Sequence, residues 1–216
     1  MLVLASNSPR RRQLFALGGW VFNIVAVEID ERPLPGESPT DYVLRLAENK
    51  ARAVASQVGP DSLVVAADTT VVDGLDILGK PANEHEAMIM LTRLRGHIHQ
   101  VYTAIAVLYI ENGLLLKDIC VTDVPMRDYS DQEIHEYIAG GDPLDKAGAY
   151  AIQHNVFHPV NGLAGCFANV MGLPLCHLTR TLHKLRIDPQ HPIPQACQTT
   201  LEYDCPIFEH VLQGYS

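Results

Sequence analysis

The sequence LVLASNSPRRR, residues 2–12, contains the transition that decides the fold. Its first apolar residues form a run of the length of a buried strand, and a turn of hydroxyl and amide side chains follows. Ser8 is a preferred helix N-cap, and Pro9 suits the first helical position because no N–H is needed there. The stretch therefore predicts a short inner strand, a tight turn and a helix.

Three arginines, Arg10, Arg11 and Arg12, open this helix. The free N–H groups and the positive end of the dipole favour an anion at a helix N-terminus. Guanidinium groups add hydrogen-bond donors that match phosphate oxygens. We interpret the stretch as a polyphosphate-binding site. The alternative is an ordinary capped helix with a basic first turn, in which three basic residues would oppose the dipole.

The composition is that of a globular protein. The 216 residues suffice for one α/β domain, or for one domain and a tail, and 47% of them are hydrophobic. The net charge of −9 argues against a non-specific nucleic-acid binder, which needs a basic surface. No signal peptide is expected because arginines interrupt the first apolar run, and no apolar run has membrane-spanning length. We expect a cytoplasmic protein with neither nucleic acid nor membrane as a partner.

Strand and helix patterns alternate along the chain and are followed by a long hairpin, which predicts an α/β domain with an elongated mixed sheet flanked by helices. The proline-rich remainder, residues 187–216, is expected to be an irregular tail after a domain of residues 1–186. The predicted strands are 21–27, 63–67, the hairpin 71–78 and the hairpin 98–126, and the predicted helices are 9–18, 38–57, 83–94, 130–139 and 174–185.

Two carboxylates come directly after predicted strands, at places where side chains converge on a cleft. Asp68 follows the apolar run 63–67, and Glu31 follows the strand predicted at 21–27. A carboxylate held rigidly in this way suits a general base or a metal ligand. The alternatives are a turn-forming aspartate and a solvated acidic loop.

Three lysines add positive charge: Lys50 on a predicted helix, Lys80 in a Gly-Lys-Pro turn, and Lys146. Each alone is typical of a surface lysine, but with the arginines they have the charge to neutralise a triphosphate. Two carboxylates beside a basic site fit Mg²⁺-assisted cleavage of a phosphoanhydride bond. The chain has no GxxxxGK[ST] loop, no GxGxxG after a strand and no GxSxG, so it shows no P-loop, dinucleotide or serine-hydrolase motif.

Eight segments, in order, resemble the Maf family of nucleoside triphosphate pyrophosphatases over about the first 185 residues. They are LASNSPRRR at 4–12, VEIDE at 27–31, LAENKA at 46–51, AADTTV at 66–71, GKP at 79–81, LRGHIHQVYTAIAV at 94–107, GDPLDKAGAYAIQ at 141–153 and NVMGLPL at 169–175. The resemblance implies one α/β domain with a cleft, similar in architecture to the inosine triphosphate pyrophosphatases. It also implies a cytoplasmic homodimer that depends on a divalent metal, Mg²⁺ or Mn²⁺.

The reaction implied by the resemblance is hydrolysis between the α- and β-phosphates of a nucleoside triphosphate, which gives a monophosphate and pyrophosphate. At the matching positions, Asp68 would accept the proton of the attacking water, and Glu31 with Asp68 would hold the metal. The implied phosphate or transition-state contacts are Ser8, Arg10, Arg11, Lys50 and Lys80.

The resemblance also bears on the choice of base. Arg10, Thr69 and Gln153 together resemble the dTTP/UTP subgroup of the family. The amide of Gln153 offers an acceptor for the N3–H of uracil or thymine and a donor for O4. A glutamate there would instead suit two guanine donors.

Two regions depart from the family pattern. Residues 154–162, HNVFHPVNG, replace a Gly-rich and partly acidic stretch of the family. We expect this replacement to alter the wall of the base pocket and with it the choice of substrate. The tail contains Cys197 and Cys205, which could pair, although cytoplasmic thiols are normally reduced. The alternative function is a nucleotide-binding regulator of septum formation or cell division without turnover. The presence of Asp68, Glu31 and Lys80 favours an enzyme, because a pure sensor needs no base for water.

Overall fold

The computed structural model of the chain describes residues 1–214 and contains a six-stranded mixed β-sheet. Its order is β2-β1-β3-β5-β6, with β4 paired to β3. β1 is parallel to β2 and β3, whereas β3 is antiparallel to β4 and β5, and β5 to β6. The predicted α/β fold with a mixed sheet is thus confirmed. The strands are β1 Leu2–Leu4, β2 Phe22–Ile24, β3 Leu63–Asp73, β4 Asp76–Leu78, β5 Ile98–Tyr109 and β6 Leu114–Pro125.

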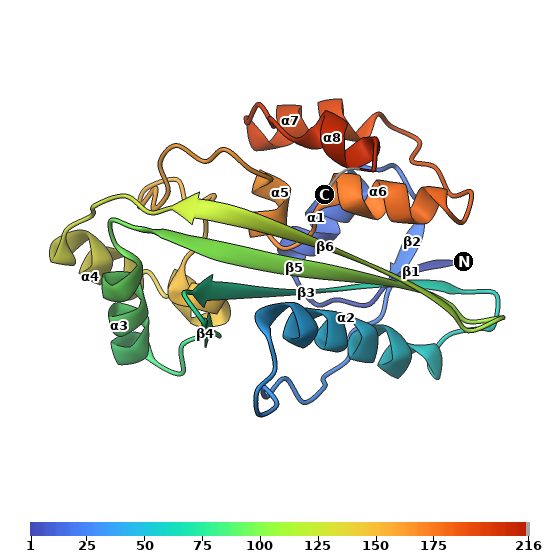
Figure 1. Cartoon of the computed structure of the whole chain (residues 1–216), viewed down its shortest axis with the longest axis horizontal. Helices are drawn as coiled ribbons and strands as arrows, with labels where there is room; N and C mark the ends of the chain where they lie inside the picture. The colour runs from blue at the N-terminus through green and yellow to red at the C-terminus, as the bar shows by residue number, and fades with distance from the viewer. Residues whose placement is uncertain (215–216) are drawn as a thin grey trace.

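Helices cover both faces of this sheet. Figure 1 shows α2 along one side and α6 on the other, with α3 and α4 near one end of the long strands. The predicted caps are present: the Ser8 hydroxyl accepts from Arg11 N–H, and Ser130 with Glu133 forms a capping box. The helices are α1 Pro9–Ala16, α2 Pro39–Ala55, α3 Glu84–Leu94, α4 Asp131–Ala139, α5 Phe167–Val170, α6 Leu175–His183, α7 Ile193–Leu201 and α8 Phe208–Leu212, with 3₁₀ turns η1 Asp142–Asp145 and η2 Ala147–Ala149.

Strand β3 separates the two halves of the hydrophobic core. Leu63, Val65 and Ala67 belong to the core beside α1, α3 and α6, whereas Val64 and Ala66 belong to the core beneath α2. Because successive strand residues point to opposite faces, this alternation buries both faces of β3. The continuous apolar run in the sequence follows from this double burial.

Strand β3 is longer than predicted and has an open edge. The prediction that it ends at residue 67 is wrong, since it continues through Asp73. β1 pairs with residues 63–65 and β4 with residues 71–73, so no strand of the described part pairs with residues 66–70 on that edge. Side chains from both faces of the sheet therefore reach this gap.

The segment after residue 186 is not the irregular tail that we predicted. It forms α7 and α8, and side-chain hydrogen bonds tie it to the domain. The Tyr203 hydroxyl donates to the carbonyls of Leu163 and Gly165, at 3.1 and 2.8 Å. Two prolines of this segment lie at the N-terminal end of α7, where proline is tolerated. Cys197 and Cys205 are both free thiols.

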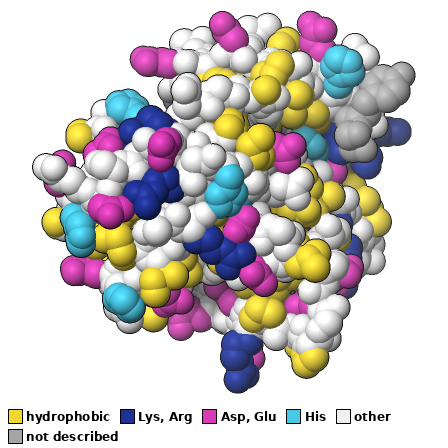
Figure 2. Space-filling view, turned by 60° about the vertical axis from the view of Figure 1, so that its left-hand side comes forward, with side chains coloured by type: hydrophobic (Ala, Val, Ile, Leu, Met, Phe, Trp, Pro, Cys, Tyr) yellow, Lys and Arg dark blue, Asp and Glu magenta, His cyan; other side chains and the backbone are white. Residues whose placement is uncertain are grey.

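The surface carries charges of both signs. On the face shown in Figure 2, acidic and basic side chains are interspersed, in keeping with the many surface ion pairs. None of the helices within residues 1–214 combines the length and the apolar character that crossing a membrane requires.

Candidate active site

A cavity of about 330 Å³ opens at the gap in the sheet edge, between the N-terminus of α1 and residues 68–71 of β3. Strand β1 ends there and delivers the turn that caps α1, while α2 passes beneath. All nine residues to which the family resemblance assigns a role in the site line this one cavity: Ser8, Arg10, Arg11, Glu31, Lys50, Asp68, Thr69, Lys80 and Gln153.

The N-terminus of α1 forms one wall of the cavity. Ser8 caps the helix, its Oγ accepting from the Arg11 N–H at 3.4 Å, and Ser8 N–H donates to Ser6 Oγ at 3.2 Å. Arg10 and Arg11 are half-buried and line the cavity, whereas Arg12 is exposed and is not among the lining residues. The positive end of the helix and two guanidinium groups thus face the same space.

Arg11 is held by a chain of hydrogen bonds that runs into the core. Its Nε–H donates to the Gly172 carbonyl at 2.8 Å, and its Nη2–H donates to Thr69 Oγ1 at 3.0 Å. Thr103 Oγ1 donates to the Asn169 carbonyl at 3.0 Å, so the 2.9 Å contact between the two threonines must use the proton of Thr69. Burial lowers the pKa of Arg11, with the nearby Asp68 charge opposing. Its orientation is therefore fixed before any anion arrives.

Two carboxylates meet at one ammonium group on the opposite side of the cavity. Lys50 Nζ, on α2, donates to Asp68 Oδ1 at 2.6 Å and lies 2.7 Å from Glu31 Oε1. Asp68 lies on the α2 side of β3 and is 5% exposed. Burial raises the pKa of Asp68, and the charges of Lys50 and Arg11 offset this only in part. Asp68 is thus a carboxylate with increased proton affinity.

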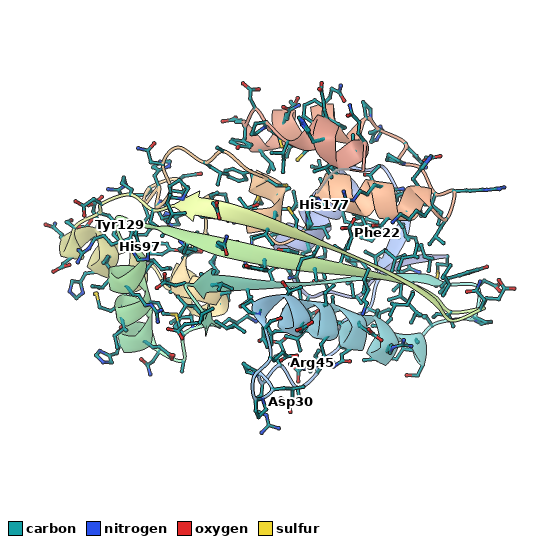
Figure 3. The ribbon with its side chains drawn as sticks, in the orientation of Figure 1. Phe22, Asp30, Arg45, His97, Tyr129 and His177 are labelled. Carbon is teal, nitrogen blue, oxygen red and sulfur yellow. The ribbon has the colours of Figure 1, made fainter. Side chains whose placement is uncertain are left out.

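Glu31 reaches this position from a loop and not from the end of a strand. The prediction that it directly follows the second strand is wrong, because β2 ends at Ile24. The Tyr42 hydroxyl donates to the Glu31 carbonyl at 2.9 Å, and Arg45 binds Glu37 farther along the loop. Figure 3 shows Arg45 reaching from α2 toward this loop.

The charges around Glu31 set its ionisation. Burial alone would raise the pKa of Glu31, but the hydrogen bond from Lys50, together with the charges of Lys50, Lys80 and Arg11, brings it below its usual value. Glu31 is therefore an anion at neutral pH.

Two further lysines line the cavity in different states. Lys80 is exposed and makes no ion pair with any residue of the described part. Lys146 is buried, and its Nζ donates to the side chains of Asp142 and Asp145 at 3.1 and 2.5 Å. Lys146 therefore holds the loop that leads to Gln153, while the charge of Lys80 is available to a ligand.

Gln153 lines the cavity at the end of this loop, whereas the atypical segment 154–162 does not contribute to the lining. His154 Nδ1 accepts from the Phe157 N–H at 2.9 Å, and the Phe157 ring stacks on Tyr137 with centroids 4.4 Å apart. The segment is thus folded back onto the core, and its departure from the family pattern lies outside the cavity.

Two lining tyrosines were not predicted from the sequence. Tyr42 fits the apolar spacing of the helix predicted at 38–57, and Tyr150 lies within the segment GDPLDKAGAYAIQ, where no role was assigned to it. The Tyr150 hydroxyl lies 2.8 Å from Nε2 of the buried His99. No local pattern indicates this pair, because its members are 51 residues apart.

The donor set fits a hard divalent cation. Glu31 and Asp68 each place a carboxylate oxygen against the same group, the ammonium nitrogen of Lys50. Mg²⁺ in nucleotide enzymes is typically bound by one or two carboxylates, with phosphate oxygens and waters completing the shell. Among residues 1–214, no three His, Cys, Asp or Glu side chains are grouped so that they could hold a metal by themselves.

Comparisons with known proteins identify relatives of this chain. A protein of Geobacter sulfurreducens named dTTP/UTP pyrophosphatase is 44% identical over 184 residues, which cover 85% of this chain and 96% of the relative. A protein of the same name from Anaeromyxobacter dehalogenans is 46% identical over 185 residues, covering 85% and 93%. Among solved structures, a HAM1 protein from Coxiella burnetii matches with a TM-score of 0.42 at 19% identity, covering 59% of this chain and 73% of that one.

A family model described as Maf-like protein matches residues 1–185, up to the point where α6 has ended and the C-terminal segment begins. The match therefore includes every residue that lines the cavity. On this match and on the identity to the relatives, the chain belongs to the Maf family.

Proposed function

We propose that the chain hydrolyses dTTP and UTP to the monophosphate and pyrophosphate. The observation that carries the proposal is one cavity with an arginine-bearing helix N-terminus on one side and the Asp68–Lys50–Glu31 cluster on the other. The names of the relatives from Geobacter sulfurreducens and Anaeromyxobacter dehalogenans support the choice of nucleotides. That the chain works as a cytoplasmic homodimer stays a prediction of the family resemblance.

Each wall of the cavity has a different task. Arg10 and Arg11, beside Ser8 at the positive end of α1, bind the β- and γ-phosphates, and Lys80 neutralises charge that develops on the leaving pyrophosphate. Asp68 takes the proton of the water that attacks the α-phosphate. Its raised pKa makes it a better proton acceptor than an ordinary aspartate.

Glu31 and Asp68 would hold a divalent metal, Mg²⁺ or Mn²⁺. When bound, such an ion neutralises phosphate charge and polarises the phosphoryl oxygen. This chain's contribution is to hold the two carboxylates rigidly: Asp68 within a strand, and Glu31 through the Tyr42 hydroxyl on its carbonyl.

Gln153 recognises the base at the other end of the cavity, where its amide pairs with N3–H and O4 of uracil or thymine. The Thr69 hydroxyl is engaged by Arg11 and Thr103, so Thr69 contributes to selectivity by positioning Arg11. Arg10, which makes no such internal bond within the described residues, remains available to the substrate.

Product analysis tests the function. With Mg²⁺ or Mn²⁺, the protein should release pyrophosphate from UTP and dTTP, and Asp68→Asn should bind nucleotide but lose turnover about 10³-fold. Release of orthophosphate would point to a different NTPase or phosphatase. Absence of any product across a nucleotide panel would favour the regulator, and near-normal turnover by Asp68→Asn would contradict the role of Asp68.

A further inference from the structure

We propose that the ammonium group of Lys50 occupies the cation position between Glu31 and Asp68, and that a divalent metal binds there tightly only when a triphosphate draws Lys50 away. The inference rests on the proposed function and deepens it. It makes Lys50 the residue that couples metal binding to nucleotide binding.

The geometry places Lys50 where the metal would lie. Its Nζ is 2.7 Å from Glu31 Oε1 and 2.6 Å from Asp68 Oδ1, so the two carboxylates share one cation. The Lys50 side chain is 13% exposed and that of Asp68 is 8% exposed. The Glu31 side chain is 47% exposed, so the space is shielded from water on the Asp68 side, and an ammonium group and a divalent cation repel each other there. One of them must leave.

The cavity offers Lys50 a second position only when a polyphosphate is present. Five cationic and three anionic side chains line it, so the positive groups are in excess. Phosphate oxygens bound at the N-terminus of α1 would supply Lys50 with other acceptors within the same cavity. A lysine suits this exchange because its charge is carried on a flexible stem.

The structure supplies a matched control in Lys80. Both lysines line the same cavity and both charges act on Glu31, but only Lys50 contacts the two carboxylates. Loss of Lys80 therefore reports the general effect of removing a positive charge. Loss of Lys50 reports that effect together with vacating the cation position.

The test is a titration of the nucleotide-free protein with Mn²⁺, with unbound Mn²⁺ measured by electron paramagnetic resonance. We expect Lys50→Gln to bind Mn²⁺ about tenfold more tightly than the wild type. The Mn²⁺ affinity of Lys80→Gln should stay within about threefold of the wild-type value, and that of Lys50→Arg should equal it. Equal affinity of Lys50→Gln and wild type would overturn the proposal. So would an equal gain in Lys80→Gln, which would show a general charge effect.

A second titration needs only the wild type and keeps the proposal testable if Lys50→Gln does not fold. Mn²⁺ affinity is compared with and without a saturating, non-hydrolysable α,β-methylene analogue of UTP, after correction for chelation by the analogue itself. We expect about tenfold tighter binding with the analogue, and equal affinities would contradict the proposal. Neither titration depends on turnover, so a failure here is distinct from a failure to release pyrophosphate.

Discussion

Protonation of His99 should destabilise the folded protein as the pH falls from neutral. His99 is 2% exposed, its Nε2 lies 2.8 Å from the Tyr150 hydroxyl, and its Nδ1 has no hydrogen-bond partner among the described residues. Burial, with the charge of His97, lowers the pKa of His99 to about 4, while Asp73 acts in the opposite direction. An unfolded chain has a histidine pKa of about 6.5.

Between these two pKa values the unfolded state binds more protons than the folded state, so the free energy of unfolding decreases as the pH falls. The difference between a pKa of about 4 in the folded protein and about 6.5 in the unfolded chain lowers the free energy of unfolding by about 3 kcal/mol in full. About 2 kcal/mol of this is lost between pH 7 and pH 5. Below the folded pKa the contribution is gone and the effect levels off.

Urea denaturation of the wild type and of His99→Gln at pH 7, 6 and 5 measures this contribution. The glutamine amide does not titrate and can still bond to the Tyr150 hydroxyl. We expect the free energy of unfolding of His99→Gln to fall by about 2 kcal/mol less than that of the wild type between pH 7 and pH 5. Parallel decreases in both proteins would refute the reasoning.

Three further substitutions test other parts of the account. Gln153→Glu should lower the ratio of UTP to GTP hydrolysis about tenfold, and an unchanged ratio would remove Gln153 from base recognition. Thr103→Val leaves the Thr69 hydroxyl without its acceptor, so the free energy of unfolding measured in urea should fall by about 1–3 kcal/mol. KM should rise as well, because Thr69 positions Arg11. Unchanged stability and KM would contradict the role assigned to this chain of hydrogen bonds. Tyr203→Phe removes the hydroxyl that ties the C-terminal segment to the domain. It should lower the free energy of unfolding by about 1 kcal/mol without changing kcat.

The helix starts were predictable because cap chemistry is local. Ser8, Ser38, Asn83 and Ser130 each accept a bond from an N–H three residues ahead, so a short window contains the whole signal. The start of α7 was missed for the opposite reason. Closely spaced prolines are typical of irregular structure, but here two of them stand at the N-terminal end of the helix, the end that accepts proline.

The extent of β3 could not be predicted, because it depends on a distant strand. Asp68 and Thr69 look like the start of a turn, yet the register with β5 pairs them with Ala104 and Thr103. The same holds for the site. Family motifs identified nine lining residues, but the bond from Arg11 to Gly172 spans 161 positions and no local pattern contains it.

The central claim is that water attacks the α-phosphate and pyrophosphate leaves. Hydrolysis of UTP in water enriched with oxygen-18, followed by mass spectrometry of both products, tests this claim directly. We predict one labelled oxygen in the uridine monophosphate and none in the pyrophosphate. Label in the pyrophosphate, or label in released orthophosphate, would contradict the claim.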